Sequence, residues 1–294
     1  KGIVIGNELN RASVRLNADV QANDWLKVGI SANYSNTKNS GVLSDGYLAG
    51  VTVAGYNAPP NVPEKIDGEY ALDANGRLAR GNNTYSYNGA NTYLNAFNHP
   101  TATINLQRNN NTSERVLGSV FAEITPIKGL KFTTKYSIDN LNNFEDQYSH
   151  PSISGLGFAY NGMVQDNIVF IKQWNWQNYV NYNFVVKDHE IGLMAGLEYQ
   201  KRKYQDLYVG ASDFVFDTYQ NVLDGLFTEQ MSGGTMNSRG NSSTFGRFNY
   251  SYKGRYIFEA SFRTDAYSGF SKNNRVGYFP GVSAAWRLSE ENFM

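Results

Sequence analysis

The chain has 294 residues with 26 basic and 26 acidic side chains, so its formal net charge is zero, and neither nucleic acid nor an anionic surface is favoured as its main partner. It contains no cysteine, which excludes disulfide bonds and thiolate metal sites. No stretch approaches the roughly 18 consecutive apolar residues of a membrane-spanning helix, so a helical membrane protein is excluded. A transmembrane β-barrel is not excluded, because apolar and polar residues alternate along its strands and the mean hydropathy of such a strand is low.

The first predicted element is a β-hairpin. In residues 13–20 and 26–34, apolar and polar side chains alternate, and a short turn at residues 22–24 separates the two runs. A period of two residues is typical of strands that have one apolar and one polar face. The hairpin is therefore expected to place Val14 and Leu16 on one face and Arg15 and Asn17 on the other.

The same alternation recurs to the end of the chain and predicts about nine strands. Three further short connections, "PIKG", "VVKDH" and "KGR", join pairs of these runs. The predicted strands are residues 13–20, 26–34, 116–125, 130–139, 173–184, 191–199, 244–252, 256–265 and 278–288.

The connections alternate between short and long. The long ones are expected over residues 35–113, 140–166, 201–243 and 266–277, and they include a flexible polar tip, "QRNNNTS", at residues 107–113. Within the first loop, Asp67–Gly68 and residues 73–76 carry turn signals, and the latter are interpreted as a turn rather than a calcium loop. Long loops at one end and tight turns at the other are typical of an outer-membrane barrel with its turns in the periplasm.

The cost of burying charge in hydrocarbon predicts which face meets lipid. An arginine near the bilayer midplane costs about 2–4 kcal/mol, so the charged face of residues 256–265 is expected to line the barrel lumen. The candidate lumen-lining residues are Arg15, Asn17, Asp19, Lys131, Lys135, Arg247, Asn249, Glu259, Arg263, Asp265 and Arg287. The candidate lipid-facing residues are Val14, Leu16, Leu26, Val28, Phe132, Tyr136, Trp176, Tyr182, Phe258, Phe262, Val282 and Trp286.

Aromatic side chains are expected at the ends of the strands, where they suit a girdle at the lipid–water boundary. The alternative is that they form the core of a soluble β-sandwich, such as a lectin. The residues in question are Trp25, Tyr34, Tyr136, Tyr252, Tyr256 and Trp286.

The last fifty residues, "FGRFNYSYKGRYIFEASFRTDAYSGFSKNNRVGYFPGVSAAWRLSEENFM", resemble the barrel of SusC/RagA-type TonB-dependent outer-membrane transporters. The resemblance rests on an Arg-x-Asn-Tyr-x-Tyr strand, an Arg-x-Asp strand end, Gly-Tyr-Phe-Pro and a Trp-Arg-hydrophobic-Ser-Glu-Glu exit. The segments "NRASVRLNADV" and "DWLKVG" near the start are similar to the family's early hairpin. The chain departs from the pattern in the loop "DAYSGFSKNNR" and in Gly281 after Pro280.

The resemblance implies a larger protein. Members of the family have an N-terminal carboxypeptidase-like domain, a TonB box, a plug and a 22-stranded barrel, so residues 1–294 are expected to be a partial barrel domain. The final residues are expected to form a periplasmic turn before a next strand. The implied partners are a SusD-like lipoprotein at the outer face, TonB, the lipid bilayer of the bacterial outer membrane, and an oligosaccharide or peptide substrate.

Nothing in the sequence indicates an enzyme or a cofactor. No nucleophile elbow or phosphate loop is present, and His99, His150 and His189 are too far apart in sequence to show metal-ligand spacing. Glu259, Arg263 and Asp265 are interpreted as ion-paired lumen lining rather than a catalytic group. An alternative function is a structural or docking barrel subunit, or an adhesin, without transport. The substrate itself stays open.

Overall fold

The fold is seen in a computed structural model that describes residues 2, 5–41, 51–57, 64–70, 86–87, 90–91, 99–152, 160–214, 220–291 and 293–294. Nine long strands form one antiparallel sheet in the order β1-β2-β7-β8-β9-β10-β11-β12-β13. They are β1 (Glu8–Asn23), β2 (Leu26–Gly41), β7 (Gln107–Ile127), β8 (Leu130–Ser149), β9 (Met163–Val186), β10 (His189–Ser212), β11 (Leu226–Tyr252), β12 (Tyr256–Tyr267) and β13 (Val276–Trp286).

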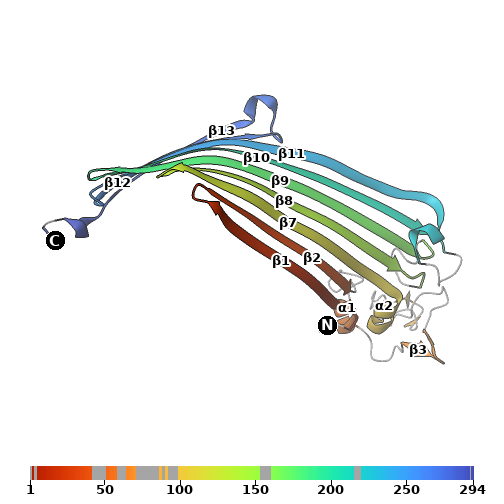
Figure 1. Ribbon diagram of the computed structural model, residues 1–294. Coiled ribbons are helices and arrows are strands. Elements are labelled where there is room, and N and C mark those ends of the chain that lie inside the picture. Colours follow the sequence, from red (N-terminus) through yellow and green to blue (C-terminus); the bar gives the residue numbers. More distant parts are fainter. Residues whose placement is uncertain are drawn as a thin grey trace.

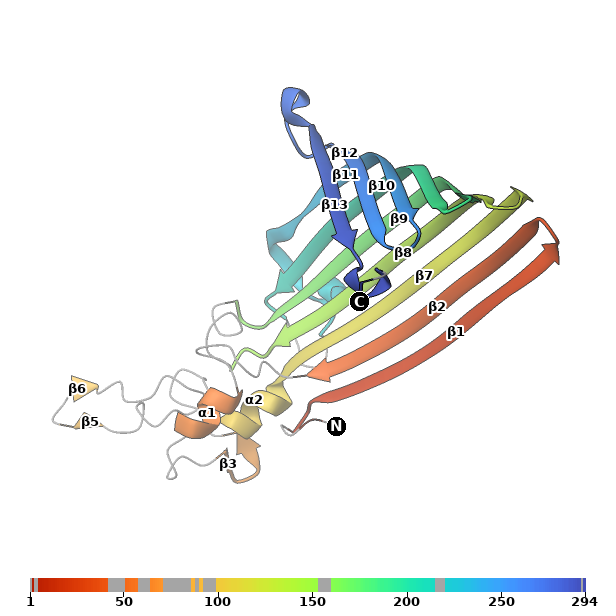
Figure 2. The same ribbon diagram turned by 90° about the vertical axis from the view of Figure 1, so that its left-hand side faces the viewer.

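The sheet is a single curved wall, as Figures 1 and 2 show from two directions. Every long strand pairs with its neighbour along the chain, and within the described residues no second large sheet packs against it. The predicted all-β antiparallel class and the nine strands are confirmed. The sandwich alternative is wrong for this part of the chain, because a sandwich needs two sheets with their inner faces in contact.

Short elements lie in the connections. Between β2 and β7 are α1 (Val51–Asn57), β3 (Lys65–Ile66), β4 (Glu69–Tyr70), β5 (Ser86–Tyr87), β6 (Ala90–Asn91) and α2 (Pro100–Leu106), and later come η1 (Val222–Asp224), η2 (Lys272–Asn274) and η3 (Leu288–Glu290). Asp67 and Gly68 have φ of 52° and 90° and form the predicted turn of the β3–β4 hairpin. The turn expected at residues 73–76 lies outside the described residues. None of the described helices has the length and apolarity to cross a membrane.

The strands are longer than the alternation predicted. β11 has 27 residues, and β9 and β10 have 24 each. The expected flexible tip at residues 107–113 is the start of β7, and residues 140–149 and 201–212 extend β8 and β10. These extensions carry polar side chains on both faces, so the period of two disappears although the backbone ladder continues. At the other end of the chain, β13 stops at Trp286, and Leu288 begins η3 instead of ending the strand.

The prediction that short turns lie at one end of the sheet and long connections at the other is confirmed. Two-residue turns join β1 to β2, β7 to β8 and β9 to β10, a three-residue turn joins β11 to β12, and the long connections all lie at the opposite end. Gly129 in the β7–β8 turn has a φ of +88°, and a Cβ there would overlap the carbonyl oxygen of Asn183. Only glycine fits that turn without strain.

The turns are also staggered. Leu26 is the first residue of β2 after the β1–β2 turn, and the row of paired residues that begins there crosses β7, β8 and β9 and reaches Ala195 on β10. Ala195 lies six residues from His189, the first residue of β10 after the β9–β10 turn. A steady shift of register along the sheet means that the strands are tilted, as closure of a barrel requires.

The described chain has only a small hydrophobic core. Tyr148, Val164, Ala211, Phe214 and Val222 form one cluster at the end of the sheet that carries the long connections. Most other large apolar side chains are exposed on the sheet, among them Phe262 at 49% and Trp176 at 44%. Such an extended apolar surface requires a covering medium or partner.

Candidate functional site

The register divides the sheet into two chemically different faces. Residues directly opposite one another in adjacent strands point to the same face. One such row crosses all nine strands through Asp19, Gly29, Phe121, Lys135, Gln177, Glu198, Ser243, Asp265 and Gly277. The neighbouring row on the other face runs through Ala18, Ile30, Val120, Tyr136, Trp176, Tyr199, Ser242, Ala266 and Val276.

All the candidate lumen-lining residues share the first face, named here the polar face. Ten of the eleven lie in strands, and Arg287 follows β13 at the position that continues the alternation. All twelve candidate lipid-facing residues lie on the second face, named here the apolar face. The structure therefore separates the two predicted sets completely.

The two faces differ in how tightly their side chains are covered. On the polar face Thr133 is 4% exposed and Ser243 is 2% exposed, although no second large sheet covers them in the described part of the chain. On the apolar face Tyr136 and Trp176 stay more than two-fifths exposed. Side chains converge on the concave side of a curved sheet and diverge on its convex side, so this contrast indicates that the polar face is the concave one.

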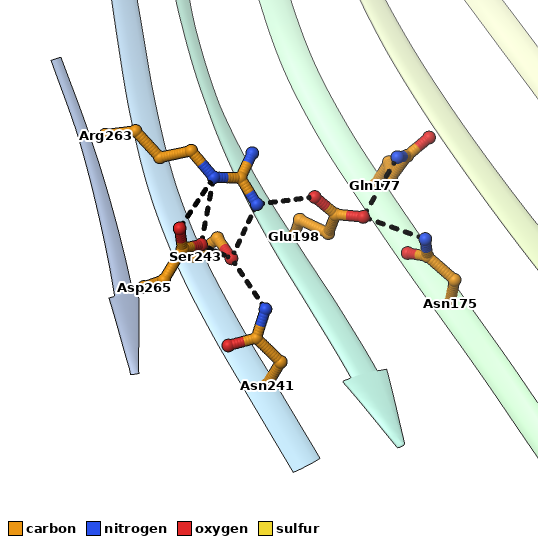
Figure 3. Close-up of polar contacts among 7 residues, drawn as sticks. All are labelled: Asn175, Gln177, Glu198, Asn241, Ser243, Arg263 and Asp265. Carbon is orange, nitrogen blue, oxygen red and sulfur yellow. Dashed lines mark hydrogen bonds and ion pairs between the residues drawn. The ribbon is translucent and has the colours of Figure 1, made fainter. Parts of the chain in front are cut away.

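A hydrogen-bonded charge cluster lies on the polar face across β9 to β12 (Figure 3). Arg263 Nε donates to both carboxylate oxygens of Asp265 at 2.9 and 3.1 Å. Its Nη2 donates to Glu198 Oε2 at 3.2 Å and to Ser243 Oγ at 2.9 Å. On β9, Asn175 Nδ2 and Gln177 Nε2 donate to Glu198 Oε1 at 2.8 and 3.1 Å. Glu198 on β10 therefore contacts side chains of two other strands, β9 and β12, and Arg263 extends the cluster to Ser243 on β11.

Sequence reasoning anticipated this cluster only in part. Arg263 and Asp265 pair with each other, but Glu259 has no ion pair among the described contacts and faces Asn249 and Ser283 across the ladder. Glu198 is the residue that the sequence reasoning missed. Its signal was available, because it alternates with the apolar Leu197 and Tyr199, but its partner on β12 is visible only once the register is known.

Further ion pairs on the polar face join neighbouring strands. Lys27 Nζ lies 2.8 Å from Asp19 Oδ2, and Lys131 Nζ lies 3.1 Å from Glu123 Oε2. Arg115 on β7 holds Asp139 on β8 with two parallel hydrogen bonds of 2.9 and 2.7 Å. The side chains of each pair are partly or largely exposed, so water screens the attraction and each pair contributes little to stability.

A polar hollow of about 540 Å³ lies on this wall beside the Arg115–Asp139 pair. Polar residues of β1, β2, β8 and β9 contribute to it, including Arg11, Arg15 and Gln173. Guanidinium and amide groups around an open hollow can donate hydrogen bonds to a polar solute.

The end with the long connections has its own polar centre. Arg108 Nε and Nη2 donate to Asp146 at 2.7 and 2.8 Å, and the same guanidinium donates to the carbonyl and the side chain of Gln220. Asp166 stands directly opposite Asp146 on the next strand. Burial, with the negative charge of Asp146 added, raises the pKa of Asp166. This centre ties a loop segment to β7 and β8.

At the opposite end, residues after β13 turn back onto the β11–β12 turn. Glu291 Oε1 accepts hydrogen bonds from Tyr256 at 2.6 Å and from Trp286 at 3.0 Å, and Arg255 donates to its Oε2 at 3.1 Å. The hydrogen bond from Tyr256 is the main cause that lowers the pKa of Glu291. This arrangement, the Glu291 clasp, fixes the chain beyond the last strand.

The position of the aromatic residues departs in part from expectation. Tyr252, Tyr256 and Trp286 lie opposite one another in a single row at the turn end, and their rings stack in sequence at 6.3 Å. Tyr34 and Tyr136 lie inside long strands rather than at their ends, because those strands continue well past the apolar rows.

Comparison with known proteins gives matches over the whole chain. TonB-dependent receptor P3 of Formosa agariphila is 27% identical over 300 residues, which cover all of this chain and 28% of that protein. TonB-dependent receptor SusC of Bacteroides thetaiotaomicron is 26% identical over 298 residues, covering all of this chain and 29% of SusC. The chain thus spans less than a third of the length of these relatives. No family model matches the sequence.

Solved structures agree in fold. The RagAB peptide transporter superimposes with a TM-score of 0.76 at 21% identity, over 98% of this chain and 31% of that one. BauA, a ferric preacinetobactin receptor from Acinetobacter baumannii, gives a TM-score of 0.55 at 10% identity, over 98% of this chain and 39% of that one. The chain thus shares with these receptors a tilted antiparallel wall with one apolar and one polar face, which is the fold of part of a transmembrane β-barrel. Over its whole length the sequence is similar to part of TonB-dependent receptors that include SusC, and its fold matches about a third of the RagAB chain.

Proposed function

We propose that this chain forms part of the wall of a TonB-dependent importer, with its apolar face against acyl chains and its polar face lining the lumen. The separation of the two faces is the observation that carries the proposal. If the polar face met hydrocarbon, Glu198, Arg263 and Asp265 would all be exposed to it, and each charge would cost up to a few kcal/mol. With the apolar face outward, that cost disappears.

The width of the apolar face supports this orientation. On β10 its side chains run from Ile191 to Tyr199, a span of nine residues, which matches the about 9–11 residues that a tilted strand needs to cross a membrane. The next two side chains on that face are Lys201 and Lys203, which suit the headgroup region rather than the hydrocarbon. The long connections follow these lysines, so they would lie outside the cell and the tight turns in the periplasm.

The remaining parts of the importer are proposed on the family resemblance. Residues 1–294 would be one part of a larger barrel domain, and the plug and TonB box would belong to other parts of the protein. A SusD-like lipoprotein would cap the outer face through the connections around residues 35–113 and 201–243. The fold shared with the RagAB peptide importer is compatible with such a pair. The substrate class is an oligosaccharide or a peptide.

Site-directed spin labelling tests the orientation. This chain has no cysteine, so single cysteines can be placed in it once any cysteines elsewhere in the full-length protein are replaced. Labels at Phe258, Phe262 and Val282 in liposomes should collide with oxygen dissolved in the acyl chains. The matched label at Ser261, next to Phe262 on the opposite face, should collide with a water-soluble nickel reagent instead. The reverse pattern, or buried labels on both faces, would contradict the proposal.

A further inference from the structure

Two arginines face each other directly on the polar face. Arg202 of β10 is the register partner of Arg239 of β11, so their Cα atoms lie about 4.5–5.5 Å apart. Both side chains are exposed. Like charges directly opposite one another in a sheet destabilise it, so this pair needs an explanation that the other charges on this face do not.

Elsewhere on the polar face, several cations have an acid beside them. Lys27 pairs with Asp19, Lys131 with Glu123, and Arg263 with Glu198. Around the two arginines the nearest acids of the same face are already engaged by other groups. Those acids and their partners are Asp139 with Arg115, Asp265 with Arg263, and Asp206 with Thr235.

The two guanidinium groups are turned apart, as repulsion predicts. Arg202 leans along its own strand, with its guanidinium carbon 5.8 Å from the centre of the Tyr204 ring. Arg239 leans toward β12, where its Nη1 donates to the hydroxyl of Tyr267 at 3.4 Å. Gln173 of β9 stands opposite Arg202 and adds an amide to the same row. Two guanidinium groups, one amide and two tyrosine side chains therefore occupy neighbouring positions on the polar face.

We propose that Arg202 and Arg239 form a subsite for a carboxylate group of the transported substrate. A guanidinium presents paired N–H donors that match the two oxygens of a carboxylate, so one acidic group can be held by both arginines. The negative charge also removes the repulsion between them. This inference rests on the proposed function, because the position is useful to an importer only if the polar face lines the lumen. It narrows the substrate to an acidic oligosaccharide or an acidic peptide.

The location fits a subsite near the outer mouth. The arginines lie four residues beyond Glu198 and Ser243 along β10 and β11, in the direction of the long connections. The row of register partners that contains the two arginines continues through Gln173 and Asp139 to Arg15, which lines the polar hollow. A substrate that enters from outside would meet these cations before it reaches the Glu198–Arg263 cluster.

The test is binding to the purified full-length protein in detergent at low salt, measured by calorimetry. The probes are trigalacturonic acid against neutral galactotriose, and triglutamate against trialanine. At least one acidic probe should bind about tenfold or more tightly than its neutral counterpart, and R202Q/R239Q should lose that preference. R202K/R239K, which keeps both charges, should retain part of it. The control K201Q/K203Q removes two charges from the same strand on the opposite face and should bind as the wild type does.

Each result decides the inference. A preference for the acidic sugar, the acidic peptide or both supports the carboxylate subsite and identifies the carrier of the group. Equal binding of acidic and neutral probes by the wild type overturns it, as does an unchanged preference in correctly folded R202Q/R239Q. Import is read separately, by TonB-dependent uptake in cells. If binding depends on the arginines but no TonB-dependent uptake occurs, the importer is contradicted and the carboxylate subsite is supported. If uptake occurs but does not depend on the arginines, the importer is supported and the subsite is contradicted.

Discussion

Glu198 and Arg263 form an ion pair with 3.2 Å between Oε2 and Nη2, although the whole of β11 separates their strands. A contact that spans an intervening strand requires long side chains that converge, which is what a concave surface provides. The same carboxylate also accepts from Asn175 and Gln177, so its removal affects four adjacent strands. Glu198 is the centre of the polar network.

Replacement of Glu198 with glutamine should destabilise the barrel by about 1 kcal/mol, because Arg263 then loses one of its charged partners in a partly screened position. E259Q on the same face should change stability by less than about half of that, because Glu259 has no ion pair among the described contacts. The measurement is unfolding of the full-length protein in urea with lipid vesicles. A double-mutant cycle with R263Q should return a coupling energy between Glu198 and Arg263, and additive losses would refute the link across β11.

The two faces predict destabilisation of very different size when arginine is placed at neighbouring positions of β12. Phe262 lies midway along β12 on the apolar face, and Ser261 lies next to it on the polar face. F262R should destabilise the folded protein in liposomes by about 2–4 kcal/mol, whereas S261R should cost far less. Equal losses at the two positions, or a larger loss at Ser261, would show that hydrocarbon does not cover the face that carries Phe262.

The part of the sheet that carries the apolar face was predictable because apolar and polar side chains alternate strictly along its strands. Both sets of face residues could be derived from the period of two, down to the side on which Phe258 and Arg263 lie. Beyond the apolar rows that constraint ends. Residues 140–149 and 201–212 are hydrogen-bonded strands in which polar and apolar side chains occur on both faces, so they lack the alternation that predicts a strand. The predicted ends of strands, and Tyr34 and Tyr136 as end residues, were wrong for this reason.

The polar network was less predictable, because it depends on register. The sequence indicates that Arg263 and Asp265 share a face, but it does not specify which residue of β10 lies two strands away. The partner, Glu198, follows from the pairing of Glu198 with Ser243 and of Ser243 with Asp265. The Arg202–Arg239 pair was equally hidden, since the two residues are 37 positions apart and meet only across the β10–β11 ladder.

The turn after β7 provides a local test of the fold. Gly129 has a φ of +88°, and an added Cβ would collide with the carbonyl oxygen of Asn183 on β9. G129A should therefore reduce the yield of folded, heat-modifiable protein and lower stability by about 1–3 kcal/mol. The matched variant is G240A, where the nearest atom to an added Cβ is the Gln200 carbonyl oxygen at 3.5 Å and φ is unstrained, so it should fold normally. Equal behaviour of the two variants would count against the close approach of this turn to β9.

The Glu291 clasp predicts a pH dependence of stability at the turn end of the sheet. The hydrogen bond from Tyr256, with those from Trp286 and Arg255, holds the pKa of the Glu291 carboxyl below its ordinary value of 4.5. A carboxyl whose pKa is lowered on folding stabilises the folded state above its ordinary pKa and loses that contribution as the pH falls through the lowered value. The thermal midpoint of wild-type protein should accordingly exceed that of E291Q near neutral pH, and the gap should close on acidification below about pH 4. E290Q is the matched control, because it replaces the neighbouring carboxyl and leaves the hydrogen bonds of the clasp in place. If E291Q followed the wild-type curve at every pH, the carboxylate would not hold Tyr256 and Trp286, and the segment after β13 would be free of the sheet.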